Sequence, residues 1–225
     1  MILYTKIQMI YNIYKPVDWT SFDVVKKIRN LTKEKKVGHG GTLDPFAEGV
    51  LIVGTGKDTK LLSTVSSANK SYTATLKLGV ETDTLDVEGE ITNQSAIPEL
   101  SVTIVEKVLS SFIGKQKQIP PMFSAKKVDG KKLYDLARKN IEIKRQPIEI
   151  EIHTLELVKL ENDLIQFSVT CSKGTYIRVL GSDIAKALGT VGHLVKLVRD
   201  SVGNYQINDS IKIDAFEKQW KNISQ

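Results

Sequence analysis

Apolar side chains return every third or fourth position over three stretches of the chain: residues 22–31, 102–112 and 177–188. This spacing places them on one face of a helix. Thr20 and Ser21 precede the first stretch, and their hydroxyl groups can bind the free amides at a helix start. Gly189 follows the last stretch, where many helices end. The pattern predicts three amphipathic helices and a shorter one over residues 133–137.

Other stretches alternate apolar and polar side chains, as in strands with one buried face: residues 72–78, 148–152 and 165–171. Cys171 ends the last of these and is expected to be a core residue. Residues 79–89 carry four acidic side chains and are predicted to form a surface loop. Strands mixed with a few helices and long connections, without regular alternation of the two, predict an α+β sheet protein.

The positive charge of the chain predicts a polyanionic partner, such as nucleic acid. The 225 residues carry a net charge of +6, with a pI near 9.2, and their length allows one large domain or two small ones. Residues 114–132 are rich in lysine and contain Pro120-Pro121, which predicts an exposed binding insertion. Arginines are few in this lysine-dominated chain, so each is a candidate for planar, two-bond recognition: Arg29, Arg138, Arg145, Arg178 and Arg199.

Other classes of protein fit poorly. The chain has no long apolar stretch and does not begin like a signal peptide, which predicts a cytoplasmic protein without a membrane span. Its single cysteine and three widely separated histidines offer neither a disulfide nor a familiar metal-ligand spacing. We therefore expect no metal site, with carboxylate-bound magnesium as the one metal chemistry left open.

One carboxylate lies in a glycine-rich turn. Asp44 follows Gly38, Gly40 and Gly41, and Pro45 comes directly after it. The glycines allow backbone conformations and close approaches that other residues do not, and the proline fixes its own φ. Taken alone, these are ordinary turn residues. The stretch nevertheless predicts a carboxylate held on a stiff turn before the apolar run 49–54.

Four further segments accompany this turn: Lys15-Pro16 with Thr20-Ser21, Lys70-Ser71-Tyr72, Pro120-Pro121-Met122-Phe123-Ser124-Ala125-Lys126, and Cys171-Ser172-Lys173-Gly174-Thr175-Tyr176-Ile177-Arg178. Together, in this order from about Asn12 to Tyr205, they closely resemble the TruB-type tRNA pseudouridine synthases. The resemblance implies the pseudouridine synthase fold, with a mixed, mostly antiparallel central sheet and flanking helices. It also implies cofactor-free isomerisation of the uridine at position 55, in the T loop of tRNA, by a protein expected to be a monomer.

The same resemblance implies the roles of individual residues. Asp44 matches the catalytic aspartate and Arg178 the arginine that pairs with it. Tyr72 matches the active-site tyrosine, a catalytic residue that faces the uracil ring and whose hydroxyl can move a proton during the rearrangement. The substrate-binding positions that match the family are His39, which stacks into the T loop, Tyr72, Tyr176 and Leu197. The insertion, about residues 114–140, matches one that closes over the T stem-loop, where its lysines meet phosphates: Lys115, Lys117, Lys126, Lys127, Lys131 and Lys132.

Each assignment has an ordinary structural alternative. Arg178 suits a structural salt bridge, Tyr72 and Tyr176 suit the core, and the lysines suit a solvated face. Asp86 aligns with a family aspartate near the active site, but an acidic surface loop explains it equally well, so it receives no role.

The chain departs from the family pattern at three places. Asp18 and Val198 stand where the family commonly has Gly and Arg. After Tyr205 only a short helical tail, residues 206–225, is expected, which leaves no room for the family's PUA-like domain. The expected catalytic domain is therefore residues 9–205, and translation could begin at Met1 or Met9.

Two other functions compete with tRNA modification. One is a guide-RNA-dependent synthase acting on ribosomal RNA, which needs the PUA-like domain. The other is a non-catalytic tRNA-binding or folding protein, against which the presence of Asp44, Tyr72 and Arg178 argues.

Overall fold

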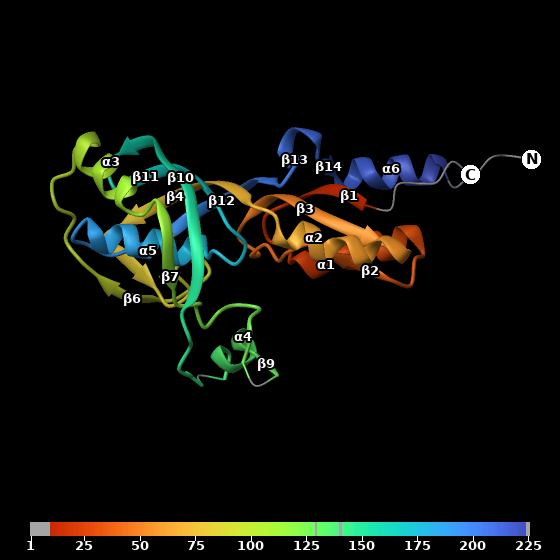
Figure 1. Cartoon of the computed structure of the whole chain (residues 1–225), viewed down its shortest axis with the longest axis horizontal. Helices are drawn as coiled ribbons and strands as arrows, with labels where there is room; N and C mark the ends of the chain where they lie inside the picture. Colours follow the sequence, from red (N-terminus) through yellow and green to blue (C-terminus); the bar gives the residue numbers. More distant parts are fainter. Residues whose placement is uncertain (1–9, 129, 140, 224–225) are drawn as a thin grey trace, which may run out of the picture. The chain divides into compact units, whose positions relative to one another are not determined.

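The computed structural model describes residues 10–128, 130–139 and 141–223, except for the side chains of Lys132 and Ile223. The alternative starts at Met1 and Met9 lie outside these residues. The chain forms two compact units. Unit 1 combines the start of the chain, up to Lys70, with its end, from Val198 on, and unit 2 is Ser71–Leu197 (Figure 1). Most strand pairings are antiparallel and a few are parallel, which confirms the predicted α+β class.

The sheet of unit 1 is built around one buried strand, β3 (Glu48–Thr55). Its antiparallel neighbours are β1 (Ile10–Lys15) and β2 (Val37–His39). The last residues of β12 (Gly192–Val202) run parallel to β3. Strand β13 (Tyr205–Gln206) follows and pairs with β12 in antiparallel orientation. Two short helical segments follow β3: η1 (Gly56–Leu61) and α2 (Leu62–Ser67). This arrangement joins residues from both ends of the chain in one sheet.

Helix α1 (Ser21–Thr32) begins where its sequence predicted. Thr20 and Asp23 form a reciprocal capping box, in which each side chain binds the other's backbone amide. Its buried face packs on β1 and β3 in a core that contains Ile13, Ile28 and Leu51. The predicted first helix is confirmed.

The last residues of the chain are also part of unit 1. Strand β14 (Ile211–Lys212) pairs in parallel with β1, after the 3-10 turn η2 (Ile207–Asp209), and α6 (Ile213–Ile223) follows. Phe216 is buried against Tyr11, with ring centroids 5.0 Å apart, and Lys27 on α1 forms an ion pair with Glu217, 2.6 Å away. The segment predicted as a short helical tail thus contributes a strand to the sheet of unit 1 and a helix to its core.

The sheet of unit 2 follows the order β12, β4 (Lys70–Leu78), β11 (Leu164–Cys171), β10 (Ile148–Glu161) and β7 (Gly114–Gln118). Side chains of β4 and β11 alternate between buried and half-buried, as predicted, and Cys171 lies in the core. Helices α3 (Val102–Ser111) and α5 (Ile177–Ala187) contact each other, and α3 also contacts β10. A hairpin of β5 (Val80–Thr82) and β6 (Ile91–Gln94) follows β4.

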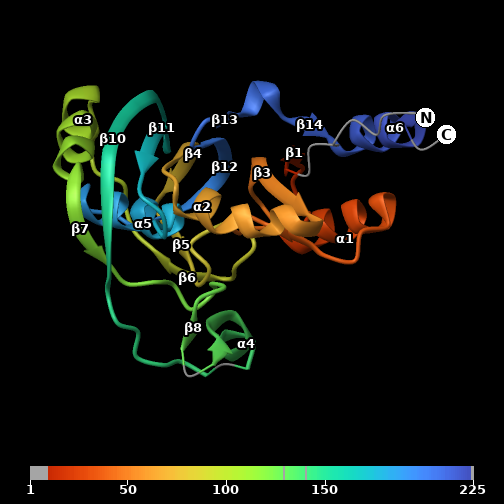
Figure 2. The ribbon, with the colours of Figure 1, turned by 45° about the vertical axis from the view of Figure 1, so that its right-hand side comes forward.

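The predicted insertion begins inside this sheet. Strand β7 pairs with β10, so residues 114–118 belong to the sheet itself. The connection that follows carries the hairpin β8 (Lys127–Val128) and β9 (Lys131–Lys132) and the short helix α4 (Leu133–Ala137). In both views, this part of unit 2 lies apart from the sheet of that unit (Figure 1, Figure 2).

Candidate active site

Asp44 lies in a turn between β2 and β3 of unit 1, which we call the Asp44 turn (residues 40–47). The Asp44 carbonyl accepts a hydrogen bond from the Ala47 amide at 3.2 Å, and Gly40 donates its amide to the Ile52 carbonyl at 2.8 Å. A side chain at Gly40 would come within 2.8 Å of Val65. The Asp44 carboxylate is half-buried on this closely packed turn.

Side chains from the start of the chain hold the middle of the turn. The buried hydroxyl of Ser21 accepts a hydrogen bond from the Leu43 amide at 2.8 Å and donates one to the Leu43 carbonyl at 3.1 Å. The fully buried ammonium of Lys15 donates to the carbonyl of Pro45 at 3.1 Å. The Asp18 amide donates to the same carbonyl at 3.0 Å. Both residues that flank Asp44 are thus fixed through their backbone.

Arg199 on β12 binds the start of the turn and, beyond the end of the turn, strand β3. Its guanidinium, buried with the rest of the residue, donates from Nη1 to the Thr42 carbonyl at 3.2 Å and from Nη2 to the Gly41 carbonyl at 3.3 Å. Nε donates to the carbonyl of Val50 at 2.7 Å. Gly49 has φ +108°, and a side chain there would lie 2.4 Å from the Arg199 carbonyl oxygen. Glycine at 49 therefore permits the close approach of β12.

His39 is half-buried at the end of β2, just before the Asp44 turn. Burial lowers the pKa of its imidazole below the ordinary value of 6.5, and the nearby positive charge of Arg199 lowers the pKa further. Among the described residues, its buried Nδ1 has no hydrogen-bond partner. The ring is therefore expected to be neutral at physiological pH.

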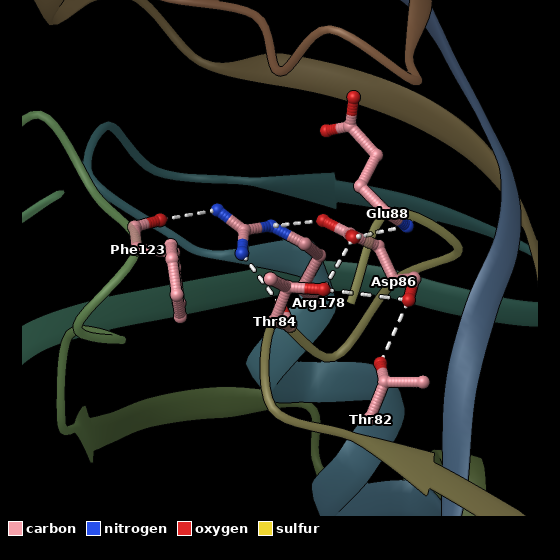
Figure 3. A network of polar contacts seen from close by, with 6 residues as sticks. All are labelled: Thr82, Thr84, Asp86, Glu88, Phe123 and Arg178. Atoms are coloured by element: carbon pink, nitrogen blue, oxygen red, sulfur yellow. Dashed lines mark hydrogen bonds and ion pairs between the residues drawn. The ribbon is translucent and has the colours of Figure 1, made fainter. Parts of the chain in front are cut away.

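Unit 2 contains a second buried polar cluster, centred on Arg178 at the start of α5 (Figure 3). Nε lies 3.4 Å from Asp86 Oδ2, while Nη1 and Nη2 donate to the carbonyls of Thr84 and Phe123, both at 2.7 Å. Arg178 and Asp86 are almost completely buried. The guanidinium thus links α5 to the loop after β5 and to the connection after β7.

The loop around Asp86 fixes this carboxylate. Oδ1 accepts hydrogen bonds from the Thr84 hydroxyl at 2.6 Å and from the Glu88 amide at 3.0 Å, and the Thr82 hydroxyl binds the Asp86 carbonyl at 2.7 Å. The expectation that residues 79–89 lie on the surface is wrong at Asp86. An acidic, polar loop gave no sequence signal for burial, because the compensating guanidinium is far along the chain.

The predicted base-binding residues of unit 2 come from three elements. Tyr72 lies on β4 and Leu197 on β12, and both are buried. Tyr176 is half-buried and precedes α5, where the Gln118 side chain binds its amide at 2.8 Å and its carbonyl at 3.1 Å. Gln118 was not predicted to have a role. Asp44 and His39 belong to unit 1, so the expected pairing of Asp44 with Arg178 stays a prediction.

The predicted phosphate-binding lysines fall into two groups. Lys115 and Lys117 project from β7, directly opposite Glu151 and Glu149 on β10. Lys127 and Lys131 are exposed on β8 and β9, and Lys126 beside them is half-buried. The side chain of Lys132 lies outside the described residues. In the described part of the chain, Lys127 and Lys131 form no ion pair, whereas Lys115 and Lys117 each face an acidic residue across the ladder.

Residues 10–128, 130–139 and 141–223 contain no group of three or more His, Cys, Asp or Glu side chains that could hold a metal ion. Within the same ranges, no helix is long and apolar enough to cross a membrane.

Comparisons with known proteins agree with this geometry. Residues 29–177 match the profile of the TruB family pseudouridylate synthase N-terminal domain. The tRNA pseudouridine synthase B of Psychrobacter cryohalolentis is 46% identical over 217 residues, which cover 94% of this chain and 60% of that protein. The same enzyme of Clostridium kluyveri is 46% identical over 210 residues, covering 93% of this chain and 72% of that protein.

Solved structures show the same fold. A Cbf5-Nop10-Gar1 complex contains a chain with TM-score 0.73 and 28% identity, matched over 96% of this chain and 56% of that one. An H/ACA RNP bound to a substrate RNA containing 2′-deoxyuridine gives TM-score 0.69 and 26% identity, over 96% and 55% of the two chains. These neighbours confirm the pseudouridine synthase fold. The chain spans about 60% of the length of the first Psychrobacter relative.

Proposed function

Because the chain belongs to the TruB family of pseudouridylate synthases, we propose that it converts uridine 55 in the T loop of tRNA to pseudouridine, with Asp44 as its catalytic carboxylate. The observation that carries this proposal is the Asp44 turn. Ser21 and Lys15 fix the residues on either side of Asp44, so that one carboxylate is presented in a defined position. Such fixed placement is what a group acting on a bound base requires.

The reaction suits a site with one such carboxylate. The bond between C1′ and N1 breaks, the uracil rotates, and C1′ bonds to C5, while the C5 proton is lost and N1 gains one. No electrons are exchanged with another molecule, so the isomerisation needs no redox cofactor. In this proposal the ionised Asp44 acts as nucleophile or stabilises the positive charge that develops at the sugar.

Unit 2 supplies the complementary parts in this proposal. Arg178 pairs with Asp44 when RNA is bound and keeps the carboxylate ionised. Tyr72, Tyr176 and Leu197 surround the flipped uracil, and contact with them offsets the few kcal/mol that unstacking costs. Gln118, which binds the backbone of Tyr176 at both amide and carbonyl, holds that residue in place.

The remaining contacts are made to the T stem-loop. His39 stacks on bases of the loop, which its neutral ring favours because an uncharged imidazole loses less hydration on stacking. Lysines on β8 and β9 neutralise phosphates of the stem. We propose a protein that acts as a monomer in the cytoplasm, where its tRNA substrate is found.

The first test is tritium release from C5 of the target uridine in an unmodified T-arm stem-loop, with enzyme in excess. Wild-type protein should release tritium, and Asp44→Asn, which keeps the size of the side chain but removes its charge, should release none while still binding the RNA. Asp58→Asn is the matched control, since Asp58 lies on η1 of the same unit.

Full-length tRNA and ribosomal RNA fragments separate the competing functions. Release from neither stem-loop nor tRNA by the wild type would contradict the proposal. Release only in the presence of a guide RNA would instead favour the guide-dependent function. Equal release by wild type and Asp44→Asn would remove Asp44 from the mechanism.

A further inference from the structure

Arg199 is a buried cation whose hydrogen bonds all go to neutral groups. The residue is 1% exposed, and its partners among the described residues are the carbonyls of Gly41, Thr42 and Val50. Burying a guanidinium without a carboxylate is costly, because carbonyl dipoles replace its hydration only in part. An apolar side chain at this position of β12 would avoid that cost but would leave the three carbonyls without these donors. The guanidinium is therefore best explained by the backbone that its three hydrogen bonds hold in place.

The three carbonyls lie on both sides of Asp44. Gly41 and Thr42 precede it, and Val50 follows at the point where the chain has entered β3. From these contacts we infer that Arg199 is a positioning residue for pseudouridine formation, whose guanidinium ties the start of the Asp44 turn to β3 and so fixes the catalytic carboxylate between them. This inference rests on the proposed function of Asp44.

The shape of the guanidinium suits this task. Nε, Nη1 and Nη2 each donate one hydrogen bond, and the planar group fixes their relative directions. A lysine has three donors on a single nitrogen and cannot bind the carbonyls of the turn and that of Val50 at the same time. Lys15 shows the difference, because its ammonium gathers carbonyls around one point, those of Pro16, Trp19 and Pro45.

Strand β12, which carries Arg199, packs against the residues that follow the Asp44 turn. Arg199 pairs in register with Gly49, where a side chain would meet the Arg199 backbone. Any shift of β12 along β3 would carry the guanidinium away from all three carbonyls. The position of the Asp44 carboxylate is therefore tied to the register of β12 on β3.

His39 gives an independent readout of the Arg199 charge. Its ring lies near the guanidinium, which is the second cause, after burial, of its lowered pKa. Replacing Arg199 by a neutral residue should raise the pKa of His39 toward the ordinary value. Arg199→Lys keeps a positive charge and should leave that pKa closer to the wild-type value, even where catalysis suffers.

The test compares single-turnover rates, RNA affinity and the His39 pKa in wild type, Arg199→Met, Arg199→Lys and Arg29→Met. Arg29 is the matched control, since it is a half-buried arginine of unit 1 that binds one carbonyl, that of Val37, outside the Asp44 turn. We expect Arg199→Met to lower the rate about 100-fold, the size of effect produced by misplacing a catalytic group by about 1 Å. Arg199→Lys should lose about tenfold, and all variants should bind RNA within about threefold of the wild type.

Three results would overturn the inference. The first is a rate for folded Arg199→Met equal to that of Arg29→Met. The second, which decides the matter if Arg199→Met does not fold, is an unchanged rate for Arg199→Lys. The third is a rate loss matched by an equal loss of RNA affinity. Failure of the proposed function itself is distinct, because the wild-type protein would then form no pseudouridine.

Discussion

At the scale of single residues, the site depends on side chains that bind backbone rather than substrate. Ser21 and Lys15 hold the neighbours of Asp44 through carbonyls and an amide. Such contacts leave no pattern in the sequence, because a carbonyl belongs to every residue. The Asp44 turn could be predicted because its glycines and proline are adjacent. The partners of Arg199 and Arg178 could not, since each lies far along the chain.

His39 gives a prediction on pH at this scale. Its folded-state pKa lies below 6.5, so the unfolded chain takes up the proton first as the pH falls. The buried neutral ring therefore contributes stability above about pH 6.5 that is lost as the pH falls through its folded pKa. NMR titration of the imidazole should show the lowered pKa directly.

Urea unfolding between pH 5 and 8 checks the consequence for stability. The free energy of unfolding of the wild type should fall more steeply with decreasing pH than that of His39→Gln, which cannot take up this proton. Identical slopes for the two proteins would show that the folded and unfolded pKa values of His39 agree, contrary to the structure.

At the scale of elements, local pattern predicted three of the longer helices, the strands β4 and β11 and the first residues of β10, but it did not assign β1, β3 or β12 as strands. The helical spacing of residues 22–31 and the alternation of residues 72–78 each correspond to one element with one buried face. Two-residue strands such as β8, β9 and β14 are too short to show a period, so their pairing depends on tertiary contacts. Strand β7 was assigned to the insertion for a different reason. Its Lys and Gln residues are all polar, so the segment resembles an exposed loop.

The placement of β7 predicts that the two groups of lysines differ in their contribution to RNA binding. Lys115 and Lys117 face glutamates across the ladder, whereas Lys127 and Lys131 have no ion pair among the described residues. We expect Lys127→Ala with Lys131→Ala to weaken T-arm binding more than the same pair of changes at 115 and 117. A plot of the logarithm of affinity against the logarithm of salt concentration should also become less steep, by roughly 0.7–0.9 for each lost phosphate contact.

Fluorescence anisotropy at several salt concentrations measures both effects. The double variant at 115 and 117 is the matched control, because it removes the same charge from the same unit. Equal losses of affinity in the two double variants would contradict this prediction, because the lysines of β7 would then bind RNA as strongly as those of β8 and β9.

Helix α6 gives a prediction on stability. Phe216 is 4% exposed in the core of unit 1, between Tyr11 and Trp220. Phe216→Ala should lower the free energy of unfolding by about 3–5 kcal/mol, the usual cost of removing a buried phenyl ring. Phe22→Ala is the control, because Phe22 on α1 is 61% exposed and should change stability by no more than about 0.5 kcal/mol.

Urea denaturation followed by tryptophan fluorescence compares the two, since Trp220 stacks on Phe216. A small effect of Phe216→Ala would mean that α6 does not contribute to the core as its burial indicates.

At the scale of the whole molecule, the two compact units do not follow one another along the sequence. Unit 2 is one continuous segment, whereas unit 1 joins the first 70 residues to those from Val198 on. Periodicity and motifs relate residues that are neighbours in sequence. They therefore predict domains that are continuous segments of the chain. The parallel pairings of β14 with β1 and of β12 with β3 join the two ends instead.

This discontinuity has a consequence for how the protein is made. A ribosome releases β1 and β3 early, but their partners β14 and the second half of β12 are translated only after all of unit 2. At about 5–20 residues per second, the first strands wait roughly 7–40 s for them. The guanidinium that closes the Asp44 turn belongs to that late segment. A nascent chain stalled before Val198 therefore displays the whole glycine-rich motif without the side chain that sets its geometry.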